Sequence, residues 1–233
     1  MFFLGSGSLL SQAVHHTCAV GINIDLVCCP FGDSALPRLK KLGVPVLESN
    51  DPNVDLLPHL NSREDSQLFS LNNKRILTDA ILKSGPECFN IHNGLVQKYR
   101  GLAEICIFAA LCNGEDRYGV TLQKLLPNQK VDAGPILAQR AFLLNNGDSF
   151  HQVMKRSLDC CVEIFKDNIV DISKNIYDSY YVEVSQHAYS YKDIGRLCAG
   201  AGPDRFSKAS NLGPYRAFFP RLMAAVSAVE FGG

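Results

Sequence analysis

The 233-residue chain has no tryptophan, only three methionines and no excess of charge of either sign. Lysine plus arginine and aspartate plus glutamate both number 23. The chain therefore lacks the long-range positive field that draws a polyanion to a protein. It also has no run approaching the roughly 20 apolar residues that a membrane-spanning helix needs. We therefore expect neither a nucleic acid nor a membrane as a partner.

No Cys-x-x-Cys pair of the metal-binding or redox kind occurs among the nine cysteines. Most of them lie within apolar runs, as the pairs Cys28-Cys29 and Cys160-Cys161 do. His15-His16 has no cysteine or carboxylate partners at ligand spacing, so these histidines are expected to be packed or solvated. The pattern predicts buried thiols in a reducing, cytoplasmic compartment and no metal site.

A chain of this length, 46% hydrophobic, can form one large domain, or one domain with a small appendage, around a buried core. Met1-Phe2-Phe3-Leu4 lacks a basic flank, so a first buried strand is expected rather than a signal peptide. The last ten residues, 224–233, stop part-way through or just after an apolar helical run. Such an ending would suit a domain of a longer protein.

Short apolar stretches alternate with helical stretches along most of the chain. Strands are expected at 2–4, 22–29, 44–47, 67–71, 88–92, 119–125 and 135–142, and helices at 9–14, 34–42, 72–83, 102–112 and 149–172. This alternation predicts an α/β fold with a twisted, mostly parallel sheet and helices on both faces. We expect a catalytic domain at 1–179 and a C-terminal extension at 180–233, made of a short hairpin and a helix.

Three polar residues near strand ends carry the chemistry that we expect. Side chains alternate along a strand, so Asn90 and His92 point to the same face. The His92 imidazole can take a proton from an amine near neutral pH, and the Asn90 amide can donate to an oxygen that gains negative charge. Asp132 would orient the imidazole and favour its protonated form. The other interpretation of Asn-x-His is a satisfied polar pair near a surface turn.

A glycine-rich turn, Gly5-Ser6-Gly7-Ser8, separates the first strand from the first helix. Backbone N–H groups at such a turn can cradle a phosphate. A plain strand-to-helix turn is the alternative, because the full dinucleotide-binding pattern is absent. We keep the four residues as a weak candidate for substrate binding.

Four motifs in order resemble the N10-formyltetrahydrofolate-dependent formyltransferase family, which includes methionyl-tRNA, glycinamide ribonucleotide and sugar N-formyltransferases and formylation domains of nonribosomal peptide synthetases. The motifs are Phe89-Asn90-Ile91-His92-Asn93-Gly94, Lys98-Tyr99-Arg100-Gly101, Tyr118-Gly119-Val120-Thr121 and Val131-Asp132-Ala133-Gly134-Pro135-Ile136-Leu137. The resemblance covers about residues 1–170 and implies a Rossmann-like formyltransferase fold.

By this resemblance Asn90, His92 and Asp132 fall on the family's catalytic triad, as oxyanion donor, general base and orienting partner. Arg75, Ile76 and Leu77 fall where the family binds the pterin ring of N10-formyltetrahydrofolate, the formyl donor. Gln129, Lys130 and Val131 fall in the loop that closes over the ring. Ile76 and Leu77 also have a simpler interpretation as core residues.

Two segments depart from the family pattern. Asn93-Gly94-Leu95-Val96-Gln97 stands where the family usually has Pro-Ser-Leu-Leu-Pro, so a more flexible loop is expected after the histidine. The segment from Thr121 to Asp132 is about two residues longer than the family pattern.

The resemblance implies formyl transfer to the amine of a small or carrier-bound acceptor. We favour an aminoacyl group on a carrier protein in nonribosomal peptide synthesis, with a nucleotide-linked amino sugar as the alternative. Transfer to tRNA is disfavoured, because the chain is neutral and lacks the additional C-terminal barrel of tRNA-formylating relatives. A formyltetrahydrofolate hydrolase and a non-catalytic scaffold domain are two further hypotheses.

Overall fold

The computed structural model describes residues 1–61 and 65–231 and divides into two compact units. The first unit contains residues 1–91, 122–138 and 161–181, and the second contains 92–121, 139–160 and 182–233. These limits do not follow the expected boundary at residue 180, since the C-terminal residues share a unit with two earlier segments.

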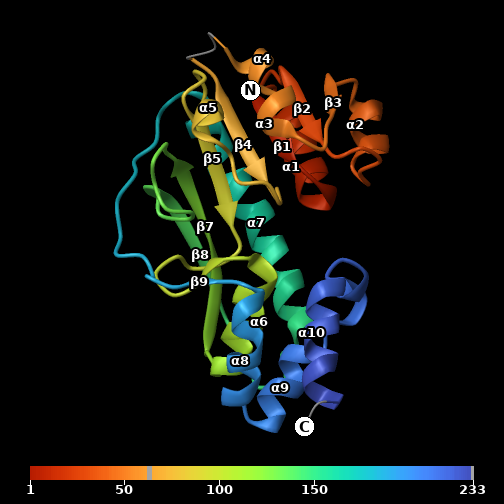
Figure 1. Ribbon diagram of the computed structural model, residues 1–233. Helices are drawn as coiled ribbons and strands as arrows, with labels where there is room; N and C mark the ends of the chain where they lie inside the picture. The colour runs from red at the N-terminus through yellow and green to blue at the C-terminus, as the bar shows by residue number, and fades with distance from the viewer. Residues whose placement is uncertain (62–64, 232–233) are drawn as a thin grey trace. The chain divides into compact units, whose positions relative to one another are not determined.

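A seven-stranded sheet organises the first unit, and three of its strands, β5, β7 and β8, run on into the second (Figure 1). Its order is β3-β2-β1-β4-β5-β7-β8. The strands are β1 (Phe2–Gly5), β2 (Leu26–Cys29), β3 (Val46–Glu48), β4 (Gln67–Leu71), β5 (Glu87–His92), β7 (Arg117–Leu125) and β8 (Ile136–Leu143). The pairs β1–β2, β1–β4, β2–β3 and β4–β5 are parallel. The predicted α/β fold with a mostly parallel sheet is confirmed.

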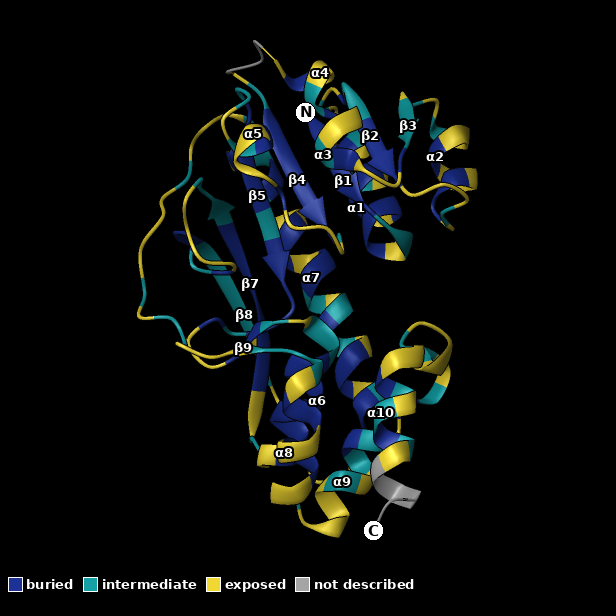
Figure 2. Cartoon of the chain, viewed as in Figure 1, coloured by how far each residue is buried: buried dark blue, intermediate teal, exposed yellow. Residues whose placement is uncertain are grey.

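The strands β1, β2 and β4 are buried almost throughout, so both faces of this part of the sheet are covered, and β4 is dark blue in Figure 2. On one face Phe69 of β4 lies between Phe3 of β1 and Phe89 of β5, with ring centroids 5.9 and 5.3 Å away. Phe165 of helix α7 (Phe150–Ser173) meets Phe69 edge-on at 5.1 Å. Side chains alternate along each strand, so Phe2 and Leu68 point to the opposite face. There they join a second apolar cluster.

Within the described residues of the first unit there are also five shorter helices. They are α1 (Gly7–Ala19), α2 (Leu36–Leu42), α3 (Pro52–Asp55), α4 (Leu57–Leu60) and α5 (Asp79–Leu82). Leu56, Leu60 and Ile81 from the region of α3, α4 and α5 pack into the second apolar cluster. The short helices α3 and α4 lie between the expected strands at 44–47 and 67–71, where the sequence analysis predicts no helix. Burial raises the pKa of the thiols of Cys28 and Cys88 in this unit to about 12.

The second unit is mainly helical, and its other elements pack around α6 (Ala103–Asn113), which is buried from Ile105 to Cys112. Its other elements are β6 (Arg100–Gly101), β9 (Ala188–Tyr189), η1 (Tyr191–Asp193), α8 (Ile194–Gly200), α9 (Pro203–Ser210), η2 (Gly213–Ala217) and α10 (Pro220–Phe231). The expected hairpin after residue 180 does not form. Instead β9 pairs in parallel with β6, and Tyr180 makes only an isolated bridge to Ile136 in the first unit.

The predicted helix at 72–83 is wrong over most of its length, since only Asp79–Leu82 is helical. Asn72 has a left-handed backbone, with φ +51°. The Asn73 side chain donates to the Arg75 carbonyl at 2.7 Å and accepts from the Arg75 N–H at 3.0 Å. Such local side-chain bonds to the backbone compete with helix formation. Residues 73–78 therefore form an open segment before α5.

Among the described residues, no helix combines the length and the apolar character that crossing a bilayer requires.

Candidate functional site

Strand β5 carries two of the expected residues. Asn90 is half-buried in the first unit, and its Cα pairs with that of Ser70 on β4. His92 ends the strand, belongs to the second unit and is 5% exposed. One residue, Ile91, lies between them on the strand, so both side chains point to the same face.

The imidazole of His92 has a defined partner within the second unit. Its Nε2 lies 2.8 Å from the carbonyl oxygen of Tyr99. A carbonyl only accepts, so Nε2 carries the proton and donates it. In the neutral ring Nδ1 is then the basic nitrogen, as a residue that removes a proton from an amine requires.

The loop that follows His92 makes hydrogen bonds to neighbouring side chains of the second unit. Buried Tyr118 donates its hydroxyl to the Asn93 carbonyl at 2.7 Å, and Thr121 donates to the Gly94 carbonyl at 2.8 Å. A Cβ on Gly94 would lie 2.5 Å from the Tyr99 carbonyl oxygen and 2.6 Å from Nε2 of His92. Glycine is therefore the residue that lets this loop pack against the imidazole.

Asp132, in the first unit, is buried and has a left-handed backbone with φ +54°. This conformation is uncommon for a residue with a side chain, and such strain concentrates at functional positions. Two residues on, a Cβ on Gly134 would lie 1.8 Å from the Lys124 carbonyl oxygen. The Lys124 N–H donates to the Pro135 carbonyl at 2.9 Å. The turn from Asp132 to Gly134 is thus fixed against β7.

Gln123, which the sequence analysis missed, supports this carboxylate. It lies on β7, is fully buried, and donates through Nε2 to Oδ1 of Asp132 at 3.0 Å. Its Oε1 is buried and has no hydrogen-bond partner in the described residues. The only sequence signal is a polar side chain among the apolar residues of a strand. Such a signal does not say which residue the amide contacts.

Arg75, Ile76 and Leu77 lie on the open segment before α5, within the first unit. Ile76 is 72% exposed, whereas Leu77 is buried in the apolar cluster beneath the segment. The Arg75 guanidinium donates to the Asn50 carbonyl at 3.2 Å. The Ile76 carbonyl accepts from Asn53 Nδ2 at 3.0 Å. One expected residue of the three is therefore in the core and two are at the surface.

Gln129, Lys130 and Val131 follow a turn that is attached to the same short helix. Asn128 has φ +59°, and its N–H donates to the carboxylate of Asp79, the first residue of α5, at 3.2 Å. Val131 is 44% exposed. Residues 75–77 thus precede α5 in the chain, and residues 129–131 follow the residue that is hydrogen-bonded to α5. Each of these two expected cofactor-binding segments exposes an apolar side chain. A flat heterocycle binds to such a combination of apolar surface and backbone groups.

The turn Gly5-Ser6-Gly7-Ser8 already binds a carboxylate of the protein itself, that of Asp33. Gly7, with φ +67°, donates its N–H to Oδ1 of Asp33 at 2.9 Å, and Ala35 donates to the same oxygen at 2.8 Å. Ser6 Oγ donates to the Asn72 carbonyl at 2.8 Å. A phosphate at the start of α1 would compete with the Asp33 carboxylate, so substrate binding at this turn stays a prediction.

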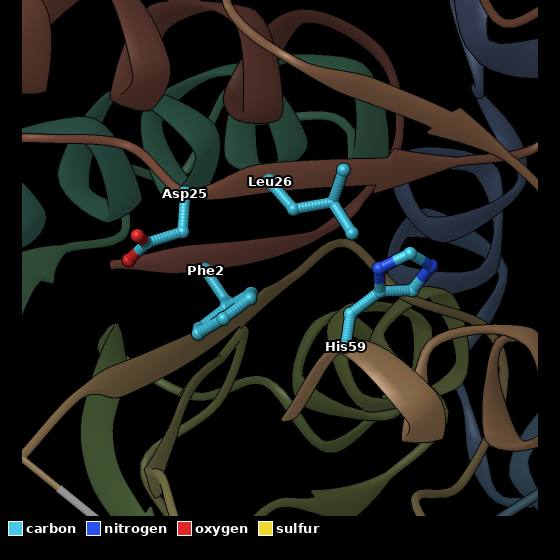
Figure 3. A pocket seen from close by; sticks show the side chains of 4 residues that line it. All are labelled: Phe2, Asp25, Leu26 and His59. Carbon is cyan, nitrogen blue, oxygen red and sulfur yellow. The ribbon is translucent and has the colours of Figure 1, made fainter. Parts of the chain in front are cut away.

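A small cavity of about 180 Å³ opens at the amino-terminal ends of β1 and β2 (Figure 3). It is lined by Phe2, Asp25, Leu26 and His59. Phe2 and Leu26 begin β1 and β2, whereas ligands of open α/β sheets bind beyond the carboxyl ends of the strands. Within residues 1–61 and 65–231, no group of three histidine, cysteine or acidic side chains could hold a metal ion.

Residues 72–169 match the family model described as formyl transferase. Methionyl-tRNA formyltransferase of Thermotoga neapolitana is 29% identical over 189 residues, which is 75% of this chain and 57% of that protein. The chain therefore spans little more than half the length of this curated relative.

Solved structures share the fold. A sugar 3N-formyl transferase, WlaRD, crystallised with dTDP and 5-N-formyl-THF, has a TM-score of 0.70 at 21% identity and covers 82% of this chain and 69% of its own. A 4-N formyltransferase from Francisella tularensis has a TM-score of 0.71 at 19% identity, over 92% of this chain and 88% of its own. The formyltransferase fold that the sequence motifs imply is thereby confirmed.

Proposed function

We propose that this protein, which is related to the formyl transferase family through residues 72–169, transfers a formyl group from N10-formyltetrahydrofolate to an amine. One observation carries the proposal. Asn90 and His92 lie two positions apart on one strand and point to the same face. Asp132 is buried, has a left-handed backbone and accepts a hydrogen bond from Gln123. These are the residue types that acyl transfer to an amine requires.

Each residue has a defined task in this proposal. His92, with its proton on Nε2, accepts the proton of the attacking amine at Nδ1. Asn90 donates its amide N–H to the formyl oxygen as negative charge develops there. In the role that the resemblance implies, Asp132 is the orienting partner of the imidazole, and its negative charge favours the protonated form. Bound N10-formyltetrahydrofolate supplies the formyl group.

The folate donor fits the first unit at the two segments attached to α5. Exposed Ile76 and Val131 offer apolar surface, and the backbone of Arg75–Leu77 offers hydrogen-bonding groups. Gln129 and Lys130 lie on the second segment, where they would contact the donor once it is bound.

The acceptor that we propose is a small or carrier-bound amine. An aminoacyl group on a carrier protein is the prediction from the sequence. A nucleotide-linked amino sugar gains support because WlaRD, whose structure covers 82% of this chain, is named a sugar 3N-formyl transferase and was crystallised with dTDP. Methionyl-tRNA is the third candidate, since the curated relative above is named for it. The proposed compartment is the cytoplasm, because the cysteines lie in apolar sequence.

The test incubates the protein with N10-formyltetrahydrofolate and each class of acceptor separately and measures the mass of the acceptor. A gain of one formyl group on an amine supports the proposal and identifies the acceptor class. Formate release without any amine would instead identify a hydrolase. Absence of folate binding in a calorimetric titration would favour the non-catalytic scaffold.

His92→Gln is the sharpest variant for this assay. Glutamine can still donate an N–H to the Tyr99 carbonyl, but it has no basic nitrogen, so the loop is kept and proton acceptance is lost. We expect transfer to fall at least about 100-fold, in line with the contribution of general base catalysis. His15→Gln is the matched control, since His15 is exposed on α1. A His92→Gln protein as active as the control would contradict the assignment.

A further inference from the structure

We propose that Asn53 is a positioning residue for folate binding, a role that rests on the function proposed above. Asn53 lies on α3 and is half-buried. Its Nδ2 donates to the Ile76 carbonyl at 3.0 Å, and its Oδ1 accepts from the Thr78 N–H at 3.0 Å. One side chain from a distant helix thus bonds both ends of a three-residue segment within the first unit.

This pair of bonds imitates a parallel strand. In a parallel ladder one residue bonds the carbonyl of residue i−1 and the N–H of residue i+1 on its neighbour. The Asn53 carboxamide does the same to Ile76 and Thr78, and Thr78 is extended, with φ −76° and ψ 160°. Only a primary amide side chain can donate and accept in this way, because a carboxylate has no N–H.

These two hydrogen bonds fix the backbone of Leu77, which lies between Ile76 and Thr78. In an extended chain successive residues direct their backbone groups to opposite sides, so the Leu77 N–H and carbonyl face away from Asn53. Within the part of the chain that the structure describes, no group bonds to them. The Leu77 side chain is packed against Leu56 and Ile81 in the core. The segment therefore presents a fixed backbone donor and acceptor next to exposed Ile76.

A ring with a donor and an acceptor on one edge suits this arrangement, and the aminopyrimidinone ring of a folate has both. An unpaired peptide group is costly to bury unless a ligand bonds it, so prior fixation of the segment favours binding. Without Asn53 the segment would have to order when the ligand binds, and the affinity for folate would fall.

Asn53 is itself held in place. Its helix begins with Pro52, which is buried, and Ser49 Oγ donates to the Asp55 carboxylate at 2.6 Å across the helix. A further hydrogen bond joins the region before α3 to residues 75–78, since Arg75 donates to the Asn50 carbonyl at 3.2 Å. The α3 region thus acts as a scaffold for residues 75–78.

The experiment compares Asn53→Asp, which keeps the acceptor for Thr78 and loses the donor, with Asn53→Leu, which loses both. The dissociation constant of 5-formyltetrahydrofolate is measured by calorimetry. We expect increases of about 3- to 10-fold for Asn53→Asp and about 10- to 50-fold for Asn53→Leu, from the usual worth of one or two neutral hydrogen bonds. The kcat at saturating folate should stay within about 2-fold, because Asn53 contacts no reacting atom. Asn146→Asp, at an exposed position, is the control.

A second readout needs no ligand. Deuterium exchange at the backbone amides of residues 75–78 should be faster in Asn53→Leu than in the parent protein. Unchanged exchange, or an unchanged dissociation constant in folded Asn53→Leu, would overturn the proposal. If the parent protein binds no folate, the proposed function fails and the ligand named here fails with it. Exchange then still decides whether Asn53 holds the segment.

Discussion

Gln123 gives the sharpest test of how the expected catalytic carboxylate is supported. Its buried amide donates to Oδ1 of Asp132 at 3.0 Å, and Asp132 is only 6% exposed. Gln123→Met removes the donor and keeps a side chain of similar length. We therefore expect Asp132 to lose part of its orientation and part of the stabilisation of its negative charge.

The magnitude follows from the type of bond. A hydrogen bond to a charged group contributes about 1.5–3 kcal/mol. If this stabilisation is lost only in the transition state, the activation free energy rises by the same amount and kcat falls roughly 10- to 150-fold. The same loss in the folded protein would lower Tm by about 3–12 °C, at roughly 2–4 °C per kcal/mol for a chain of this size.

The assay measures steady-state formyl transfer across a pH series and thermal unfolding of the same preparations. Gln123→Glu is the informative companion, because it places a second carboxyl group beside Asp132. Two neighbouring carboxylates raise the pKa of one of them, so the acid limb of the rate profile should move to higher pH. An active Gln123→Met enzyme with an unchanged pH profile would refute the role assigned to Asp132 and its partner.

Three further predictions concern the first unit. Gly134→Ala should unfold the turn or abolish activity, since its Cβ would lie 1.8 Å from the Lys124 carbonyl oxygen, and circular dichroism with an activity assay separates the two outcomes. Asp79→Ala should raise KM for folate more than it lowers kcat, because the Asn128 N–H loses its partner; equal KM values would contradict this. Burial opposes ionisation of Glu87, but hydrogen bonds from Lys124 and Tyr177 outweigh it and hold its pKa below 4.5. The stability that it adds is present above pH 4.5 and lost as the pH falls through the lowered value, so Glu87→Gln should flatten urea-measured stability across this acidic window.

The strands could be predicted because each core strand is a short run of apolar residues that is buried on both faces. Asn90 and His92 could be placed on one strand because two polar residues occur within such a run with the period of a strand. The structure confirms the resulting sheet and its mostly parallel pairing.

The segment before α5 could not be predicted in the same way. Its apolar residues Ile76, Leu77 and Ile81 fit a helical period, but the left-handed Asn72 and the side-chain bonds of Asn73 stop the helix from forming. Pairing of β9 with β6 joins residues far apart in sequence, and two-residue strands leave no periodic signal. Gln123 makes one hydrogen bond to the Asp132 side chain, and Asn53 makes two to the backbone of Ile76 and Thr78; only coordinates show such partners.

The central claim is that His92 accepts the proton of an amine that takes up the formyl group. The most direct measurement is the rate of N-formylation by His92→Gln, compared with the parent and with His15→Gln, in preparations that bind folate equally well. We expect at least about a 100-fold loss for His92→Gln alone. Equal rates in all three proteins would contradict it.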